Sequence, residues 1–439
     1  MKGLISFVIR SVKGLIRLIF RMWKSPTATQ LRNDISKNKY KPGLFRKMDW
    51  FTFCLVCGIA IFGFLSIFAA TATATEEEVT GLGNILSTHT TYYVTFQMLW
   101  FAIGMVAMFA VATLDYHLYG KYSQIIYLLN ILVLLIVMLA ANVGRGGMKA
   151  FFSWGSTSNV SGTSHGLQPS EFGKIAIIIA LANLFANRKE PIKNFHELIP
   201  SAVFVVIPAF LVALQPDFGT MLVYFVIYMI LLYISGTSRK LIWGVIAVIA
   251  ILAIPLWFYM NTASDSFRLT RILMWLKPER YPDDARQVIN GQIAIGTGGL
   301  FGKGMFSVGS FASLGFIPDD HTDFCFAIVC EAFGLLGGGL LVAAFGILLY
   351  RLFALSRQAM DPLGRYIIVG VASMFLFHVL ENVCMILGIL PVTGIPLPFI
   401  SYGGSNCLTN MMALGLVMNV VMRSRQYQLS GHTNYTRSI

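Results

Sequence analysis

Long apolar runs separated by polar segments dominate the 439-residue chain. Each run is close to the roughly 20 residues that a helix needs to cross a bilayer. Because backbone amides find no water partner in lipid, such runs must be helical. The runs cover residues 50–72, 91–114, 124–142, 171–187, 198–214, 218–235, 241–260, 324–350, 366–390 and 404–422. The pattern predicts an all-α polytopic membrane protein with about ten transmembrane helices.

Composition supports this prediction and excludes a soluble domain. Hydrophobic residues make up 56% of the chain and charged residues only 12%, with a mean hydropathy of +0.70. A soluble domain carries about 25% charged residues, which it needs for a polar surface. A helical bundle in lipid needs far less.

The distribution of positive charge predicts the orientation. If the N-terminus is cytoplasmic, the inner segments hold 24 of the 33 lysines and arginines, in agreement with the positive-inside rule. Both termini are then cytoplasmic, and the large loop 261–323, between spans seven and eight, lies outside. The net charge of +13 is thus mostly explained by topology, and we expect no nucleic-acid partner.

The chain divides into three predicted parts. Residues 1–48 form a cytoplasmic segment, 49–422 a ten-helix membrane domain, and 423–439 a cytoplasmic tail. Within residues 1–24, basic residues recur at helical spacing opposite an apolar face, which predicts an amphipathic helix on the membrane lipids. The basic residues are Arg10, Lys13, Arg17, Arg21 and Lys24.

Polar groups at membrane depth are costly, so each is a candidate functional residue. Glu171 and Lys174 follow Gln168-Pro169-Ser170, and Asp217 stands at a break between two helices. Glu171 and Asp217 could instead be ordinary helix caps. Capping does not explain Lys174, which places a cation in an apolar helix.

The large loop contains a basic cluster on the predicted outer side. A cluster there opposes the topology rule, which suggests an anionic ligand such as phosphate. The alternative is a solvated loop of mixed charge, since acidic residues are interspersed. The basic residues are Arg268, Arg271, Lys277, Arg280 and Arg286, and the acidic ones are Asp265, Asp283 and Asp284.

Two further polar clusters follow the loop. One begins the eighth span and the other precedes the tenth, and both have a structural alternative as caps or as a kinked connection. No spacing predicts a metal cage among protein ligands, a Ser–His–Asp triad or a phosphate-binding glycine loop. The candidates are His321, Asp323 and Glu331, then Ser401, Tyr402 and Ser405.

Five segments in order along residues 48–425 carry a family resemblance. They read QPSE-x-x-K, QPDFGT, GQIAIGTGGLFGKG, HTDFCFAIVCEAFG and LPVTGIPLPFISYGGS. These segments resemble the SEDS family (shape, elongation, division, sporulation), typified by RodA, FtsW and SpoVE. The VTGIPLP stretch is more similar to RodA than to FtsW.

The resemblance implies a peptidoglycan glycosyltransferase that polymerises lipid II on the outer face of the bacterial plasma membrane. It also implies ten spans, a class B penicillin-binding protein as partner, and an essential aspartate in the large loop. Asp283 and Asp284 are the catalytic candidates, with Asp284 favoured by its position before Arg286-Gln287. Where relatives carry a Tyr-Gln pair and a second glutamate, this chain has Arg286-Gln287 and Ala332.

The residues suggest how such a reaction would proceed. A loop aspartate could accept the proton of an attacking sugar hydroxyl. Lys174, Arg271 or a divalent metal ion (Mg or Mn) could stabilise the leaving diphosphate, and the other candidate residues would line the substrate site. Two alternatives stay open: a flippase for lipid-linked precursors, although no inverted repeat is visible, and a non-catalytic scaffold for the transpeptidase.

Overall fold

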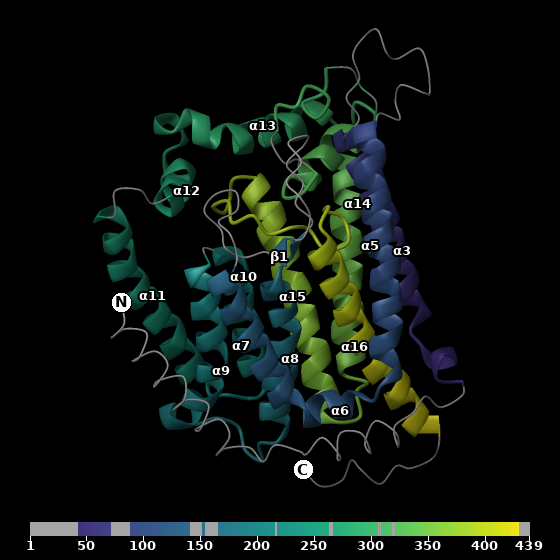
Figure 1. Cartoon of the computed structure of the whole chain (residues 1–439), viewed down its shortest axis with the longest axis vertical. Helices are drawn as coiled ribbons and strands as arrows, with labels where there is room; N and C mark the ends of the chain where they lie inside the picture. The colour runs from purple at the N-terminus through teal and green to yellow at the C-terminus, as the bar shows by residue number, and fades with distance from the viewer. Residues whose placement is uncertain are drawn as a thin grey trace.

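The structure, a computed structural model, forms a bundle of long helices. It describes residues 43–71, 88–140, 152–153, 166–215, 217–262, 267–305, 307, 309–317 and 321–429. Each of the ten predicted apolar runs forms a helix, and Figure 1 shows most of these helices running along the long axis. They are α3 (Trp50–Thr71), α5 (Thr88–Thr113), α7 (Ser123–Ala140), α8 (Pro169–Ala186), α9 (Phe195–Leu214), α10 (Phe218–Ile234), α11 (Arg239–Thr262), α14 (Cys325–Ser356), α15 (Pro362–Ile386) and α16 (Gly404–Leu429).

Seven of these helices are long and apolar enough to cross a membrane. They are α3, α5, α8, α9, α14, α15 and α16, and α7 and α10 provide shorter apolar helices. The prediction of a helical, multi-pass membrane protein is therefore confirmed.

Short elements close the two ends of the bundle. At one end α6 (Tyr116–Lys121) lies between α5 and α7, and at the other α13 (Pro282–Gly298) lies across the bundle, as Figure 1 shows. We call these the α6 end and the α13 end. The remaining elements are η1 (Leu44–Lys47), α12 (Phe267–Leu276), η3 (Pro278–Arg280) and an antiparallel pair of two-residue strands, β1 (Phe152–Ser153) and β2 (Gly166–Leu167). The predicted amphipathic helix at 1–24 lies outside the described residues.

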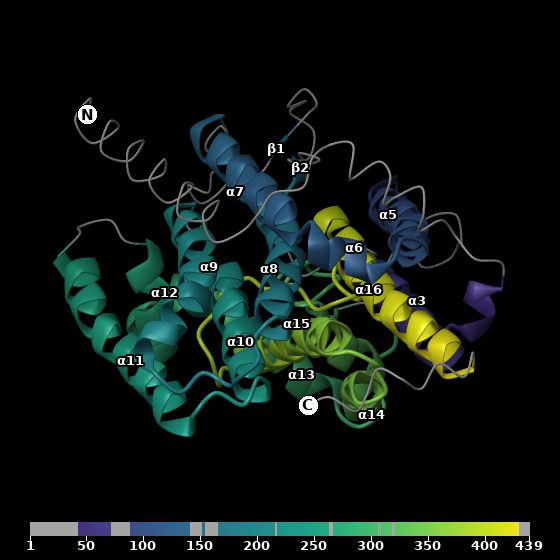
Figure 2. The same cartoon turned by 90° about the horizontal axis from the view of Figure 1, so that it is seen from below.

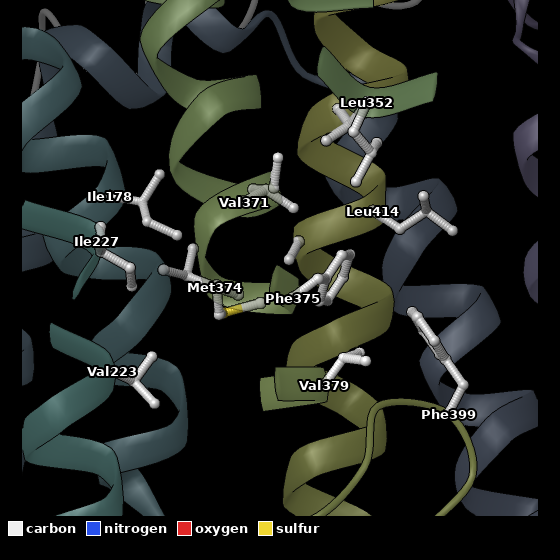
Figure 3. Close-up of a cluster of buried hydrophobic side chains, with 14 of the residues drawn as sticks. Ile178, Val223, Ile227, Leu352, Val371, Met374, Phe375, Val379, Phe399 and Leu414 are labelled. Carbon is white, nitrogen blue, oxygen red and sulfur yellow. The ribbon is translucent and has the colours of Figure 1, made fainter. Parts of the chain in front are cut away.

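Helices α8, α15 and α16 form the centre of the bundle, whereas α11 lies at one edge (Figure 2). Figure 3 shows Met374 and Phe375 of α15 between Ile178 and Ile227 on one side and Leu414 on the other. All five side chains are fully buried. In lipid such close packing replaces the hydrophobic effect as the force between helices, so the central helices give the polar residues they carry a rigid frame.

The glycine-rich run after α13 attaches that helix to α14. Lys303 N donates to Glu331 O at 2.9 Å, and Leu335 N donates to Gly299 O at 2.8 Å. A Cβ on Gly298 would lie 2.1 Å from the Cys330 carbonyl oxygen, so only glycine allows this approach. Gly334 has a φ of 69° and interrupts α14 where the two backbones meet. The glycines thus fix the position of α13.

Candidate active site

The N-terminal ends of α8, α10 and α16 meet at the α13 end through side-chain hydrogen bonds. Asp217 Oδ2 accepts from Gln168 Nε2 at 2.8 Å and from Ser170 Oγ at 3.0 Å. Ser405 Oγ accepts from the Gln168 backbone N–H at 2.9 Å. Asp217 Oδ1 also caps α10 by accepting from Thr220 N at 3.1 Å. Asp217 is therefore both the predicted cap and a link between α8 and α10, and Gln168 extends this link to α16.

Lys174 is buried in the centre of the bundle. Its side chain is 1% exposed, and its Nζ lies 2.6 Å from Glu171 Oε1 and 3.0 Å from His378 Nε2. Glu171 therefore faces Lys174 instead of only capping α8, and its Oε2 has no hydrogen-bond partner. Burying an ion pair costs desolvation energy that its mutual attraction often fails to recover. A pair kept at this depth is accordingly a strong candidate for function.

Arg271 brings a second cation to the same end, from α12. Its Nη1 donates to Val392 O at 3.4 Å, and Asp323 and Glu381 are its electrostatic neighbours. Burial lowers the pKa of the guanidinium, and the two carboxylates oppose this shift. The Thr393 hydroxyl donates to Glu381 Oε1. Arg271 thus meets the bundle where α15 leads into α16.

Asn382 fixes the backbone around this second cluster. Its Nδ2 donates to Asp323 O and to Ile395 O, both at 2.8 Å. Tyr402 N donates to His321 O at 2.9 Å. These bonds hold the segment after α13 and the 391–402 connection at one location.

Aromatic contacts link His321 and the 391–402 connection to α5. The His321 ring centroid lies 4.4 Å from that of Tyr93 and 5.6 Å from that of Tyr402. Burial raises the pKa of the Tyr402 hydroxyl above its ordinary value. The ring of His321 therefore lies beside two phenols, while its carbonyl oxygen supports Tyr402.

The connection into α16 is held in an unusual conformation. Phe399 has a φ of 64°, which is uncommon for a bulky residue. Leu397 N donates to Ser401 Oγ at 2.9 Å, and Gln97 of α5 donates to Ser401 O at 3.2 Å. A Cβ on Gly63 would lie 2.6 Å from Phe399 O. Ser401 and its neighbours hence shape the backbone of the site.

Glu331 has a fully occupied carboxylate. Its Oε1 accepts from Lys303 Nζ at 2.9 Å and from Phe311 N at 2.8 Å, and its Oε2 accepts from Ala312 N at 3.3 Å. The side chain is buried. These contacts place Glu331 under the loop that follows α13, so we expect its main role to be anchoring that loop.

The predicted catalytic aspartates, Asp283 and Asp284, lie in the first turn of α13, and their side chains are outside the described part of the chain. Lys277, Arg280 and Arg286 are exposed. Of the described side chains in the predicted basic cluster, only Arg271 contacts the site. Among the described residues no group of three or more His, Cys, Asp or Glu side chains could hold a metal ion, and the divalent ion stays a prediction.

Three site residues on α15 were missed in the sequence: His378, Glu381 and Asn382. Their spacing of three and four residues places them on one face of the helix. Each is buried. The signal was present, because the test that selected Lys174, a polar group within an apolar run, applies equally to these three.

The fold and the site define a class of protein. It is a helical, multi-pass membrane protein in which buried charges with unpaired oxygens lie near one end of the bundle, beneath helices that lie outside the apolar runs. The chain belongs to the FtsW, RodA and SpoVE family of cell cycle proteins, whose sequence model matches residues 49–426. This confirms the resemblance. The preference for RodA over FtsW stays a prediction.

Individual relatives agree with the family assignment. Stage V sporulation protein E of Bacillus subtilis (strain 168) is 32% identical over 334 residues, covering 75% of this chain and 87% of that protein. Peptidoglycan glycosyltransferase MrdB of Escherichia coli (strain K12) is 34% identical over 321 residues, covering 73% and 83%. A solved chain from a peptidoglycan synthase complex that coordinates polymerization and crosslinking superposes with a TM-score of 0.68 at 26% identity, covering 86% of this chain and 99% of that one.

Proposed function

We propose that this chain is a peptidoglycan glycosyltransferase that polymerises lipid II. One observation carries the proposal: two cations, Lys174 and Arg271, reach the same face of α15 one helical turn apart. Lys174 contacts His378, and Arg271 neighbours Glu381, three residues further along. Side chains at this spacing have Cβ atoms about 5–6 Å apart. Two cations held by partners one turn apart on α15 suit the two phosphoryl groups of a diphosphate.

The reaction transfers a sugar from one lipid diphosphate to a sugar hydroxyl of a second lipid-linked saccharide. A new glycosidic C–O bond forms, the bond between the sugar and the diphosphate oxygen breaks, and the diphosphate leaves with the bonding electrons. Lys174 and Arg271 stabilise the charge that develops on the leaving group. The proton of the attacking hydroxyl passes to a carboxylate.

Asp283 or Asp284 is the proposed proton acceptor. Both occupy the first turn of α13, directly after Pro282. The positive end of the helix dipole favours an ionised carboxylate there, and an ionised carboxylate is the form that can accept a proton. Their position at the α13 end, where the site residues gather, supports the assignment.

The proposed setting is the bacterial plasma membrane. The chain crosses it ten times, both termini are cytoplasmic, and the α13 end with loop 261–323 faces outward. The charge asymmetry of the sequence supports this orientation. A class B penicillin-binding protein is the proposed partner, which the similarity to a chain of a peptidoglycan synthase complex supports.

Purified lipid II and the partner transpeptidase provide the direct test. Asparagine keeps the shape of aspartate but removes its basicity, and general acid–base catalysis contributes about 10²–10⁴-fold. Asp284→Asn, or Asp283→Asn if that residue is the base, should abolish measurable polymerisation while the other substitution costs little. Near wild-type polymerisation by both single variants and the double variant would show that neither aspartate is the base, and no polymerisation by the wild-type chain would favour the scaffold. Lipid II translocation in proteoliposomes without polymerisation would favour the flippase.

Labelling with a membrane-impermeant maleimide tests the orientation. Glu279 and Lys189 are both exposed, on opposite ends of the bundle, and can be replaced by cysteine in a chain lacking its native cysteines. We expect Glu279→Cys to react in intact cells and Lys189→Cys to react only after permeabilisation. The reverse pattern would invert the topology.

A further inference from the structure

Helix α12 is attached to the membrane domain by two side chains. Trp275 Nε1 donates to Gly388 O at 2.9 Å, and Arg271 Nη1 donates to Val392 O at 3.4 Å. The two residues are four apart, so both project from the same face of α12. This face therefore rests on residues 388–394, the start of the connection between α15 and α16.

Glu381 lies beneath this contact, and the proposed reaction does not use it. Its side chain is buried at 2% exposure; Thr393 donates to Oε1, and Oε2 has no hydrogen-bond partner. Asp323 and Arg271 are its charged neighbours. A buried carboxylate is stable only with a partner. Burial and the neighbouring Asp323 both disfavour an ionised Glu381, and Arg271 opposes them, so ionised Glu381 and Asp323 favour an Arg271 that stays beside them.

Gly394 allows the three charged groups to approach closely. It has a φ of 78°, and a Cβ at this position would lie 3.2 Å from Asp323 Oδ2 and 3.9 Å from Arg271 Nη1. Asp323 and Arg271 hence flank the same backbone position. Glu381 reaches that segment through Thr393, the residue before Gly394. Two carboxylates and one guanidinium thus converge on a single short segment.

We propose that Glu381 is a positioning residue, which together with Asp323 seats Arg271, and with it helix α12, against residues 388–394. The seating itself requires no substrate. Its effect on polymerisation rests on the proposed function, in which Arg271 stabilises the diphosphate. Glu381 thereby fixes the position of the Arg271 guanidinium before the lipid diphosphate binds.

Hydrogen exchange of the full-length chain in nanodiscs tests the seating without activity. Glu381→Gln removes the charge and keeps the shape, and we expect the backbone amides of 267–276 to exchange at least about threefold faster. Arg271→Gln should have a similar effect, and the double variant should add little to it, because both changes break one interaction. Glu381→Asp, which keeps the charge, should restore most of the protection.

Two controls keep this test decisive. Glu197→Gln makes the same chemical change at the α6 end and should leave α12 exchange unchanged. If Glu381→Gln fails to insert, Thr393→Val removes the hydroxyl that orients Glu381 and should loosen α12 in the same way. Wild-type exchange of 267–276 in the Glu381→Gln or Thr393→Val protein would overturn the proposal.

Polymerisation kinetics then distinguish the attachment of α12 from the proposed role of Arg271 in binding the diphosphate. With α12 loosened, we expect kcat/KM for lipid II to fall about tenfold, mostly through a higher KM, because a misplaced cation weakens binding of the diphosphate. A loosened α12 with unchanged kinetics would support the seating and remove Arg271 from the proposed mechanism. An unchanged α12 would overturn the seating whatever the kinetics show.

Discussion

The two ends of the bundle treat buried charge differently. At the α6 end, Asp49 uses both carboxylate oxygens: Arg351 Nη2 and Arg425 Nη2 donate to Oδ1 at 2.6 and 2.8 Å, and Thr52 Oγ1 donates to Oδ2 at 2.6 Å. These partners hold the pKa of Asp49 far below its ordinary value although burial raises it. The cluster joins the start of α3 to the last turns of α14 and α16.

A second cluster of paired charges lies at the same end of the bundle, around His117. Its Nδ1 is 2.7 Å from Asp115 Oδ1, and its Nε2 is 3.4 Å from Asp361 Oδ2. Tyr116 donates its hydroxyl to Asp361 Oδ1 at 2.5 Å, and Arg423 Nη1 lies 3.4 Å from Asp115 Oδ2. Burial opposes ionisation, but these partners lower the pKa of both aspartates.

At the α13 end, by contrast, Glu171 and Glu381 each keep one buried oxygen without a hydrogen-bond partner. Leaving a buried acceptor unsatisfied costs about 1–3 kcal/mol, more for a charged group. A buried carboxylate whose oxygens all have hydrogen-bond partners stabilises the structure. A carboxylate with one unpaired oxygen can still bind a ligand. We infer that the α6 end fixes the helices and that the α13 end carries the chemistry.

Replacing Lys174 should have the largest effect on activity and tests whether the α13 end carries the chemistry. Lys174→Met keeps a long unbranched side chain but removes the cation. We expect the protein to insert normally and to lose about 10²–10³-fold in lipid II polymerisation, the typical cost of losing one charge-stabilising group. The assay uses purified protein with its partner transpeptidase.

A matched variant guards against misfolding as the cause. Leu181→Met introduces the same side chain into the same buried helix, two turns away, without touching a charge. It should insert and polymerise at near the wild-type rate. Wild-type turnover by Lys174→Met would remove Lys174 from the mechanism and with it the functional distinction between the two ends.

Asp49→Asn tests whether the α6 end serves only the stability of the bundle. Two arginines would lose their carboxylate, and we expect a destabilisation of about 2–4 kcal/mol, since breaking a buried charge pair is costly. The midpoint of thermal unfolding in detergent should fall by several degrees, while the specific activity of the folded fraction stays near wild type. A specific loss of turnover without loss of stability would show that the α6 end also serves the reaction.

Glu331 is an informative exception, because it lies at the α13 end, as Asp217 does, yet both of its carboxylate oxygens have partners, like those of Asp49. Glu331→Gln should therefore behave structurally, costing about 1–3 kcal/mol and weakening hydrogen-exchange protection in residues 303–312. The Lys303→Met variant should reproduce part of this effect. If Glu331→Gln left protection and stability unchanged but abolished polymerisation, its earlier assignment as a substrate-binding residue would stand against the anchoring role.

Most of the fold could be predicted from the sequence, because the constraint on a spanning helix is local. Each apolar run must satisfy its own backbone in lipid, so all ten runs became helices. The site was harder to predict, because its geometry depends on contacts between residues far apart in sequence. Lys174 could be selected from its own helix, but its pairing with His378 spans 204 residues.

The contacts of the other predicted residues also depend on the fold. Glu331 and Asp217 were selected for their charge, yet a sequence does not show that their oxygens are already occupied by Lys303, Thr220 and other partners. Glu381 shows the same signal as Lys174, a charged group within an apolar run, but the sequence does not show which groups surround it. Only the fold brings it beside Arg271.

The smallest expected effect is a pH dependence of stability at the α6 end. Burial lowers the pKa of His117, but its hydrogen bonds to Asp115 and Asp361 raise it overall, from 6.5 to about 9. Because the folded protein holds this proton more tightly than the unfolded chain, the stabilisation is complete below pH 6.5 and is lost as the pH rises through about 9. The imidazole is 47% exposed, so screening limits the contribution to roughly 0–1 kcal/mol.

Wild-type protein should therefore unfold at a lower temperature at about pH 9.5 than at about pH 6, whereas His117→Gln should show a smaller difference. Because Asp361→Asn removes one of the two carboxylates, it should also reduce the difference. Equal pH dependence in all three proteins would mean that the His117 cluster does not hold its proton against the solvent, and that the paired charges at this end contribute no stability through titration.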